Sequence, residues 1–307
     1  MRIIFAGTPE TSVPSLRLLA EKHEVIAVLT REPAPVGRKR VLTASPVHAA
    51  AEELGIPVLT PKSLKGAEIH EQILQLAPEA VAVVAYGLII PKTLLDVPTH
   101  GWINLHFSAL PRWRGAAPVQ YAIMHGDSEI ATSVFQIEAG LDTGDVFDIE
   151  SFPRDQQLTA GETLEKLALA GAAQLCRTLD HLEAGTAVAT PQVGEPTHAP
   201  QLTSADARVN FSWSAERIAN MILGTTPSPG PWTTIDGARV KLGPVTILNE
   251  TSLNPGEVKL VGKRAIAGTG TTDVVLSQVA PAGKKHMPAA DWLRGLKGET
   301  RFEVGNV

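Results

Sequence analysis

The stretch MRIIFAGTPE, residues 1–10, sets the fold class because an apolar run ends there in a glycine-containing turn. Residues 3–6 have the length of a buried strand, and Gly7-Thr8-Pro9-Glu10 leads from it into a helical pattern. Further apolar runs alternate with amphipathic patterns through the first half of the chain. This alternation is typical of a doubly wound, mostly parallel α/β sheet with helices on both faces.

The expected elements follow from the same patterns. Strands are predicted at residues 3–6, 25–29, 81–85, 103–105, 133–137 and 146–149, and helices at 13–19, 46–54, 69–76, 117–125 and 161–182. Later in the chain, a helix at 214–223 precedes short β-type runs at 233–235, 240–242, 256–260 and 274–279. Runs of this kind, separated by Gly and Pro, predict a small β-barrel.

The length of 307 residues predicts two domains. Residues 185–204 contain Pro191, Pro196 and Pro200 and few large apolar residues, which is the composition of an extended linker. We therefore expect an α/β domain at 1–184, a linker at 185–204 and the β-barrel domain at 205–307.

Composition excludes several classes of protein. The single cysteine, Cys176, rules out an intramolecular disulfide framework and a cysteine-cluster metal site, and we expect no metal. The N-terminus lacks a cleavage-site pattern, and no run approaches the ~18 apolar residues of a membrane span. The expectation is a soluble protein of the cytoplasm, without membrane contact and with no obligate protein partner evident.

The net charge of −5 is unevenly distributed along the chain. Residues 1–204 hold 15 Lys and Arg against 23 Asp and Glu, whereas residues 205–307 hold 12 against 9, a balance of +3. An excess this small is compatible with ordinary fluctuation and equally with a surface that binds a polyanion.

The candidate catalytic residues begin on the predicted strand that ends at residue 106. Alternation along a strand places Asn104 and His106 on the same side, where an amide and an imidazole can both reach one carbonyl oxygen. Asp142 stands in the glycine-flanked turn GLDTGD, residues 140–145, and that turn could return its carboxylate to His106. The first turn lacks the glycines of a dinucleotide fingerprint, so a nicotinamide oxidoreductase is the minor hypothesis.

Five motifs together resemble the formyltransferases that use 10-formyltetrahydrofolate, and specifically the methionyl-tRNA formyltransferase branch of that family. They are GTPE, AYGLII followed by proline, the run INLHFSALPRWRGAAP, GLDTGD and PAGKK, and they lie in the family's order. The resemblance places Asn104, His106 and Asp142 on the catalytic triad. It implies a Rossmann-like catalytic domain, an OB-like barrel, and transfer of the formyl group to the α-amino group of methionyl initiator tRNA for translation initiation.

The resemblance also assigns binding residues. The formyl donor, 10-formyltetrahydrofolate, is expected against Tyr86, Gly87, Leu88 and Ile90 together with Ser108, Ala109, Leu110 and Pro111. The basic insertion at residues 31–40 matches a family loop that enters the tRNA acceptor stem, which points to Arg38, Lys39 and Arg40. Lys284 and Lys285 are expected to contact tRNA from the second domain. Three departures from the family pattern are Thr11, Ala109 and residues 224–226.

Three other functions remain open on the sequence. A sugar-nucleotide formyltransferase would share the fold and triad but has no reason to carry the basic insertion. A hydrolase that releases formate would use the same catalytic residues without an amine acceptor. An inert RNA-binding module would explain a basic second domain but would leave Asn104, His106 and Asp142 without a role.

Overall fold

The computed structural model describes residues 1–37, 40–296 and 298–304, and they divide into two compact units. The first unit contains Met1–Pro118, Glu129–Pro153 and Leu164–Ala199, and the second contains Val119–Ser128, Arg154–Thr163 and Pro200–Val307. The division therefore differs from a single cut near residue 185. The segment 185–199, which follows helix α6 (Ala160–Glu183), is part of the first unit, whereas Val119–Ser128 and Arg154–Thr163 are part of the second.

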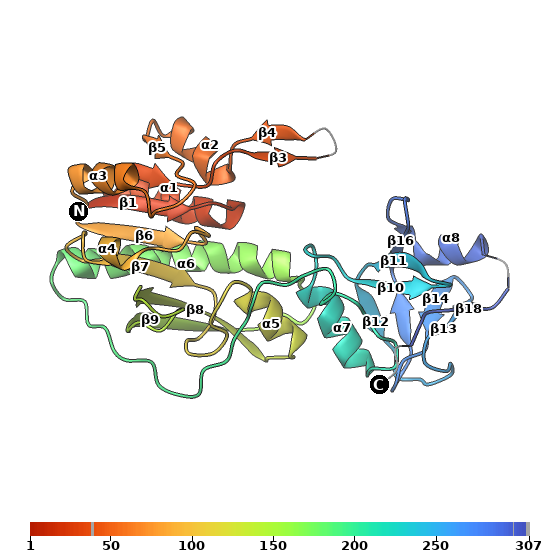
Figure 1. Ribbon diagram of the computed structural model, residues 1–307. Coiled ribbons are helices and arrows are strands. Elements are labelled where there is room, and N and C mark those ends of the chain that lie inside the picture. Colours follow the sequence, from red (N-terminus) through yellow and green to blue (C-terminus); the bar gives the residue numbers. More distant parts are fainter. Residues whose placement is uncertain (38–39, 297, 305–307) are drawn as a thin grey trace. The chain divides into compact units, whose positions relative to one another are not determined.

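A seven-stranded sheet forms the first unit (Figure 1), with strand order β5-β2-β1-β6-β7-β8-β9. Its strands are β1 (Arg2–Gly7), β2 (Glu24–Leu29), β5 (Val58–Leu59), β6 (Ala80–Val84), β7 (Trp102–His106), β8 (Glu129–Gln136) and β9 (Val146–Pro153). The first five strands in this order are parallel, and β8 and β9 each run antiparallel to the neighbour before them. The mostly parallel α/β sheet expected from the sequence is confirmed.

The helices of the first unit are η1 (Glu10–Ser12), α1 (Val13–Lys22), α2 (Pro46–Glu53), α3 (Ala67–Leu76), α4 (Lys92–Leu95) and most of α6 (Ala160–Glu183), whereas α5 (Pro118–Met124) lies almost entirely in the second unit. Alternate residues of β1, β2 and β6 form one apolar cluster with Ile69 and Ile73 of α3 and Leu94 of α4. On α6, a Cβ added to Gly171 would lie 2.7 Å from the Leu105 side chain of β7. Close packing of α6 on the sheet therefore requires glycine at this position.

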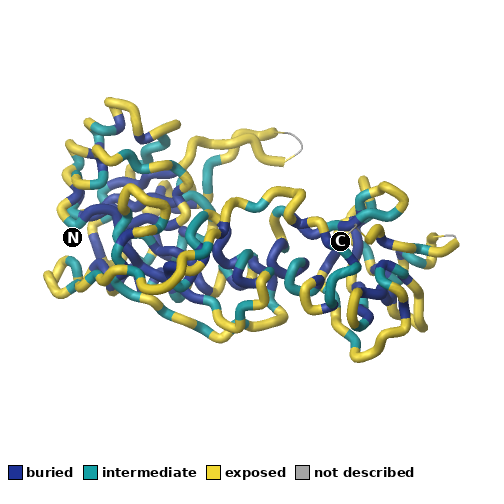
Figure 2. The backbone as a smooth tube through the Cα atoms, turned by 60° about the horizontal axis from the view of Figure 1, so that its bottom comes forward, coloured by how far each residue is buried: buried dark blue, intermediate teal, exposed yellow. Residues whose placement is uncertain are grey.

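The basic insertion at residues 31–40 begins a β-hairpin, β3 (Ala34–Val36) with β4 (Val41–Thr43). The sequence predicted a loop here. A strand whose side chains are all exposed lacks the alternation of apolar and polar residues that indicates a half-buried strand. Val36 is 56% exposed and Leu42 is 70% exposed. In Figure 2 the two strands of the hairpin are coloured as exposed. Arg40 is exposed at the turn, whereas Arg38 and Lys39 lie outside the described residues.

The second unit contains two antiparallel sheets that share a core. Its elements are α7 (Ala215–Gly224), α8 (Ala289–Arg294), β10 (Trp232–Ile235), β11 (Ala238–Leu242), β12 (Val245–Ile247), β13 (Glu257–Val261), β14 (Arg264–Ala267), β15 (Val274–Leu276), β16 (Gln278–Pro281), β17 (Met287–Pro288) and β18 (Thr300–Arg301). The orders are β10-β11-β16-β17 and β12-β15-β14-β13-β18. Helix α7 contributes Ile218 and Ile222 to the core between them.

The single run predicted at residues 274–279 is wrong in one respect. It forms two strands, because β15 pairs with β12 and β14 in one sheet while β16 pairs with β11 and β17 in the other. An apolar run carries no mark of the point at which the chain passes from one sheet to another.

Candidate active site

The carboxyl edge of the first unit's sheet opens into a cavity of about 620 Å³. Asn104 and His106 line it from β7, and Asp142 lines it from the turn between β8 and β9. The antiparallel register pairs His106 with Ser133 and Ile103 with Gln136, so β8 runs back toward the start of β7. The segment 137–145 that follows β8 then returns Asp142 to within 3.9 Å of His106. Topology therefore brings together the three residues that the sequence singled out.

His106 is buried, and one of its ring nitrogens is hydrogen-bonded. Its Nε2 lies 3.0 Å from the carbonyl oxygen of Trp113, and because a carbonyl only accepts, Nε2 carries the hydrogen. The other nitrogen, Nδ1, lies 3.9 Å from Oδ2 of Asp142. Burial lowers the pKa of His106, while the Asp142 carboxylate and the Trp113 carbonyl oppose that shift in part. The ring is therefore neutral at neutral pH, with Nδ1 free to take a proton.

Asp142 occupies a constrained turn. Its φ of 51° is in the left-handed region, which aspartate tolerates better than most residues. The Gly115 amide donates to Oδ2 of Asp142 at 2.7 Å. Gly115 has a φ of +123°, and a Cβ there would lie 2.6 Å from the carbonyl oxygen of Ala199, so this donor position requires glycine.

The residues expected to bind the folate divide into two groups. Tyr86, Gly87, Leu88 and Ile90 line the cavity, as predicted for the segment after β6. Ser108, Ala109, Leu110 and Pro111 are not among the lining residues of the cavity.

The segment 108–111 instead stabilises the loop that follows β7. The Ser108 hydroxyl donates to the carbonyl of Arg112 at 2.6 Å, and the Leu110 amide donates to Ser133 Oγ at 3.2 Å. Leu110 also packs against Phe135 and Val146. Motif matching alone could not separate residues that face the cavity from residues that shape its wall.

Gln192 is a further residue of the site, although the sequence predicted that it lies in a linker. The Gln192 side-chain amide donates to the carbonyl oxygens of Asp142 at 2.8 Å and Gly144 at 2.9 Å. Its oxygen accepts from the Arg114 guanidinium at 2.6 Å. A glutamine between prolines carries no local signal of such contacts, since all of its partners are distant in sequence.

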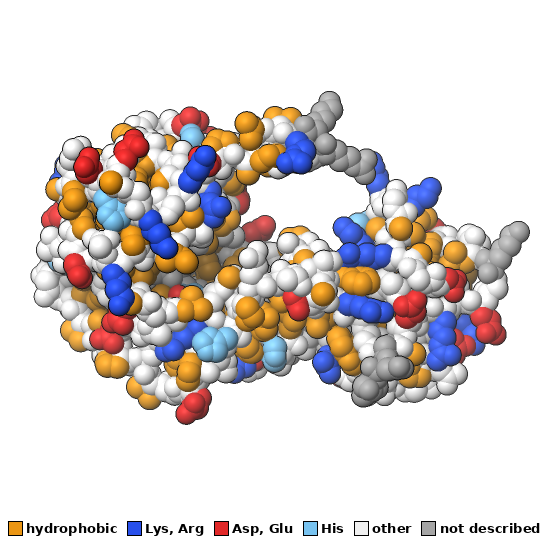
Figure 3. All heavy atoms as spheres, viewed as in Figure 1, with side chains coloured by type: hydrophobic (Ala, Val, Ile, Leu, Met, Phe, Trp, Pro, Cys, Tyr) orange, Lys and Arg blue, Asp and Glu red, His pale blue; other side chains and the backbone are white. Residues whose placement is uncertain are grey.

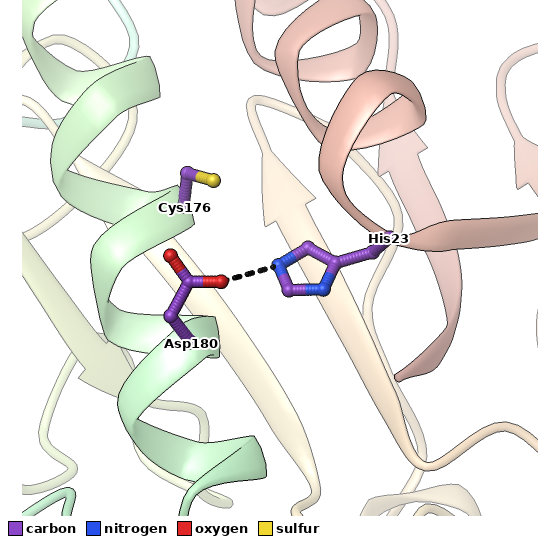
Figure 4. A group of neighbouring side chains, drawn as sticks. All are labelled: His23, Cys176 and Asp180. Carbon is purple, nitrogen blue, oxygen red and sulfur yellow. Dashed lines mark ion pairs between the residues drawn. The ribbon is translucent and has the colours of Figure 1, made fainter.

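A second group of titratable side chains lies at the opposite edge of the same sheet (Figure 4). His23 precedes β2, and it faces Cys176 and Asp180 on α6, with ligand-type atoms of all three within 4.8 Å of one another. His23 Nε2 is 3.5 Å from Asp180, and Nδ1 is 3.6 Å from Glu183 and 3.5 Å from the Met1 ammonium. The Met1 ammonium is ion-paired with Glu183 and faces the same ring, so the cluster links the N-terminus and the residue after α1 to α6 and already holds a positive charge where a metal ion would lie.

The second unit displays arginines stacked on tryptophans, another feature absent from the predicted sites. The Arg208 and Arg239 guanidinium groups lie 5.6 and 4.2 Å from the ring centre of Trp232, and Arg217 lies 4.1 Å from that of Trp213. Figure 3 shows Lys and Arg side chains gathered over β10 and β11. Lys284 and Lys285 are exposed in the turn between β16 and β17.

Family comparison agrees with this architecture. Residues 1–179 match the formyl transferase family, and residues 201–297 match the formyl transferase C-terminal domain. The class of protein is thus a formyl transferase with its own C-terminal domain.

Individual relatives narrow the class. The methionyl-tRNA formyltransferase of Paenarthrobacter aurescens is 51% identical, covering 96% of this chain and 97% of the relative. That of Salinispora arenicola is 50% identical, covering 100% and 99%. A solved methionyl-tRNA formyltransferase from Clostridium thermocellum, 17% identical, shares the fold with a TM-score of 0.57 over 90% of this chain and 98% of that one. The chain belongs to the methionyl-tRNA formyltransferase branch of the formyl transferase family.

None of the helices in the described part of the chain is long and apolar enough to cross a membrane.

Proposed function

We propose that this protein transfers the formyl group of 10-formyltetrahydrofolate to the α-amino group of methionyl initiator tRNA. The observation that carries the proposal is the meeting of Asn104, His106 and Asp142 on one cavity in a chain about half identical to enzymes named for this activity. Because that reaction serves translation, we place the protein in the cytoplasm.

The cavity fits the donor's flat ring system. Its volume is within the range of about 300–1,000 Å³ typical of small-molecule sites. Apolar side chains from two segments, 83–90 and 135–137, line it, namely Val83, Tyr86, Leu88, Ile90, Phe135 and Ile137. Such walls accept an aromatic ring.

The bound folate supplies a formyl group on nitrogen, an amide-like carbon of low electrophilicity. Asn104 lines the cavity half-buried. We assign to its side-chain N–H a hydrogen bond to the formyl oxygen as negative charge develops there. A preorganised donor stabilises the transition state more than the ground state, so its effect falls on kcat.

Proton transfer falls to His106 and Asp142. Since Trp113 retains the hydrogen on Nε2, the atom of His106 available to the reacting groups is Nδ1. The distance of 3.9 Å between Nδ1 and Asp142 Oδ2 is too long for a direct hydrogen bond. We infer that a water molecule or the substrate amine, bound beside both groups, carries the proton between them. We assign to this pair the proton that the attacking amine loses and the departing folate nitrogen gains.

Two surfaces are assigned to the tRNA. The β3–β4 hairpin exposes both Arg40 and apolar side chains such as Leu42, a combination suited to phosphate contact and base stacking. In the second unit, the arginines beside Trp232 and Trp213 add to Lys284 and Lys285. Arginine and lysine at such positions neutralise phosphates.

The experiment that tests the proposal supplies methionyl initiator tRNA and 10-formyltetrahydrofolate and measures acid-stable formylmethionine. An amino-sugar nucleotide replaces the tRNA in a parallel reaction, and formate release is followed without any acceptor. Product on tRNA alone supports the proposal. Faster transfer to the sugar nucleotide, or formate release independent of an acceptor, would overturn it in favour of the corresponding alternative.

A further inference from the structure

The segment 190–199 was expected to be a linker, yet it is hydrogen-bonded along its length to the walls of the candidate active site. Its first residue, Thr190, exchanges two backbone hydrogen bonds with Val146 at the start of β9, at 2.8 and 2.9 Å. Farther on, the Arg114 amide donates to the Thr197 carbonyl at 2.8 Å, and the Ala199 amide donates to the Arg114 carbonyl at 2.7 Å. The segment thus bridges two loops that are separate in sequence.

Gln192 makes the central contacts of this bridge. Two carbonyls of the 140–144 turn accept from its NH2 group, and the Arg114 guanidinium donates to its oxygen through Nε at 3.2 Å and Nη2 at 2.6 Å. These partners dictate the orientation of the amide, because carbonyls only accept and a guanidinium only donates. The three functional atoms of the Gln192 side chain are all engaged.

The two loops joined by Gln192 also meet at Asp142. One loop carries Asp142 itself, and the other carries Gly115, whose amide donates to the Asp142 carboxylate. Arg114 is the residue next to Gly115, so Gln192 links the backbone of the Asp142 turn to the side chain of the residue that precedes the hydrogen-bond donor. Asp142 sits at a φ of 51°, a conformation that the surrounding contacts must maintain.

We propose that Gln192 is a positioning residue, which holds the Asp142 carboxylate at its distance from His106 Nδ1. This inference rests on the proposed function, since it assumes that Asp142 handles a proton in the reaction. Displacing a reacting group by about 1 Å can lower the rate about 100-fold. Loss of the hydrogen bonds of Gln192 to Asp142, Gly144 and Arg114, which we call the clamp, should therefore lower kcat.

Two substitutions separate the halves of the clamp. Gln192→Ala removes every contact. Gln192→Glu keeps the acceptor for Arg114 but loses both donors and sets a carboxylate oxygen against the carbonyls of Asp142 and Gly144. We expect both variants to lower kcat at least tenfold while changing the dissociation constant of the formyl donor less than twofold. Glu195→Ala, at an exposed position on the same segment, is the matched control and should retain wild-type kcat.

A double-mutant cycle with Asp142→Asn supplies the decisive comparison. If Gln192 acts through the Asp142 carboxylate, adding Gln192→Ala to Asp142→Asn should lower kcat less than twofold further. A loss that multiplies in the double variant, or wild-type kcat in Gln192→Ala, would overturn the inference. Wild-type activity in Asp142→Asn alone would instead contradict the assigned role of Asp142 in the proposed function.

The pKa of His106 provides a readout that does not depend on turnover. Asp142 raises this pKa against the effect of burial, so release of the carboxylate should lower it further in Gln192→Ala, which adds no charge of its own. Titration of the His106 ring by NMR in the folded full-length protein measures that shift. An unchanged pKa in a folded Gln192→Ala variant would show that Asp142 does not depend on Gln192.

Discussion

Oδ2 of Asp142 lies 3.9 Å from Nδ1 of His106 and accepts a hydrogen bond from the Gly115 amide at 2.7 Å. The carboxylate is thereby fixed near the imidazole without being bonded to it. A water molecule or the substrate amine bound beside both groups can exchange a proton with either of them. This arrangement suits a reaction in which the attacking amine loses a proton and the departing folate nitrogen gains one.

The oxyanion assignment predicts that Asn104→Ala lowers kcat roughly 100-fold or more, because a donor aimed at developing charge acts mainly in the transition state. The dissociation constant of the formyl donor should remain nearly unchanged. Steady-state kinetics and equilibrium binding measure the two quantities. An increase confined to the Michaelis constant for the folate would remove Asn104 from the catalytic group.

For Asp142→Asn, we expect a comparable loss of kcat and a change in pH dependence. His106 must be neutral to accept a proton, and burial places its pKa below the ordinary value of about 6.5, so wild-type activity should fall only on the acid side of that value. Removing the Asp142 charge lowers this pKa further, and the acid limb of the kcat profile should move to lower pH. Full activity in this variant would reduce Asp142 to a turn residue.

The basic insertion should affect the acceptor and not the chemistry. Arg38→Ala is expected to weaken the use of methionyl-tRNA while any slow hydrolysis of the formyl donor continues at the wild-type rate, since a phosphate contact positions only the nucleic acid. Arg40→Ala, at an exposed position of the same turn, gives a second test. Equal losses of tRNA formylation and of donor hydrolysis would mean that the hairpin stabilises the fold or contributes to the folate site, and does not contact tRNA alone.

Contacts between the second unit and tRNA phosphates should show in the salt dependence of binding. Replacing both Lys284 and Lys285 by alanine should weaken binding and flatten the plot of log affinity against log salt concentration, because fewer counterions are released. Binding of the formyl donor should be unaltered. A slope equal to that of the wild type would mean that these two lysines make no phosphate contact.

His23 predicts an acid-sensitive element of stability. Burial and the Met1 ammonium lower its pKa in the folded state, although Asp180 and Glu183 oppose the shift. The unfolded chain therefore binds the proton more tightly, so the free energy of unfolding should decrease as pH falls below about 6.5. Denaturant titrations between about pH 5 and 7.5 should show a smaller decrease for His23→Gln, while a decrease equal to that of the wild type would exclude this residue as a source.

Much of the fold was predictable because its signals are local. Buried parallel strands are continuous apolar runs, and the spacing of Asn104 and His106 on one strand sufficed to place both side chains on the same side. The β3–β4 hairpin escaped prediction because an exposed strand pair has no buried face. The change of sheet between β15 and β16 was not predicted, because one apolar run of residues does not show which strands it pairs with.

By itself, the sequence determined the sheet, the residue types at its carboxyl edge and the family, since these depend on composition, periodicity and motif. Only the tertiary structure decided which motif residues face the cavity: the segment 85–90 does, whereas the segment 108–111 stabilises the wall. It alone assigned Gln192 to the site, because its contacts join residues 48 and 78 positions away in sequence. Hydrogen bonds over such separations depend on how strands are ordered in space, which no local pattern of side chains records.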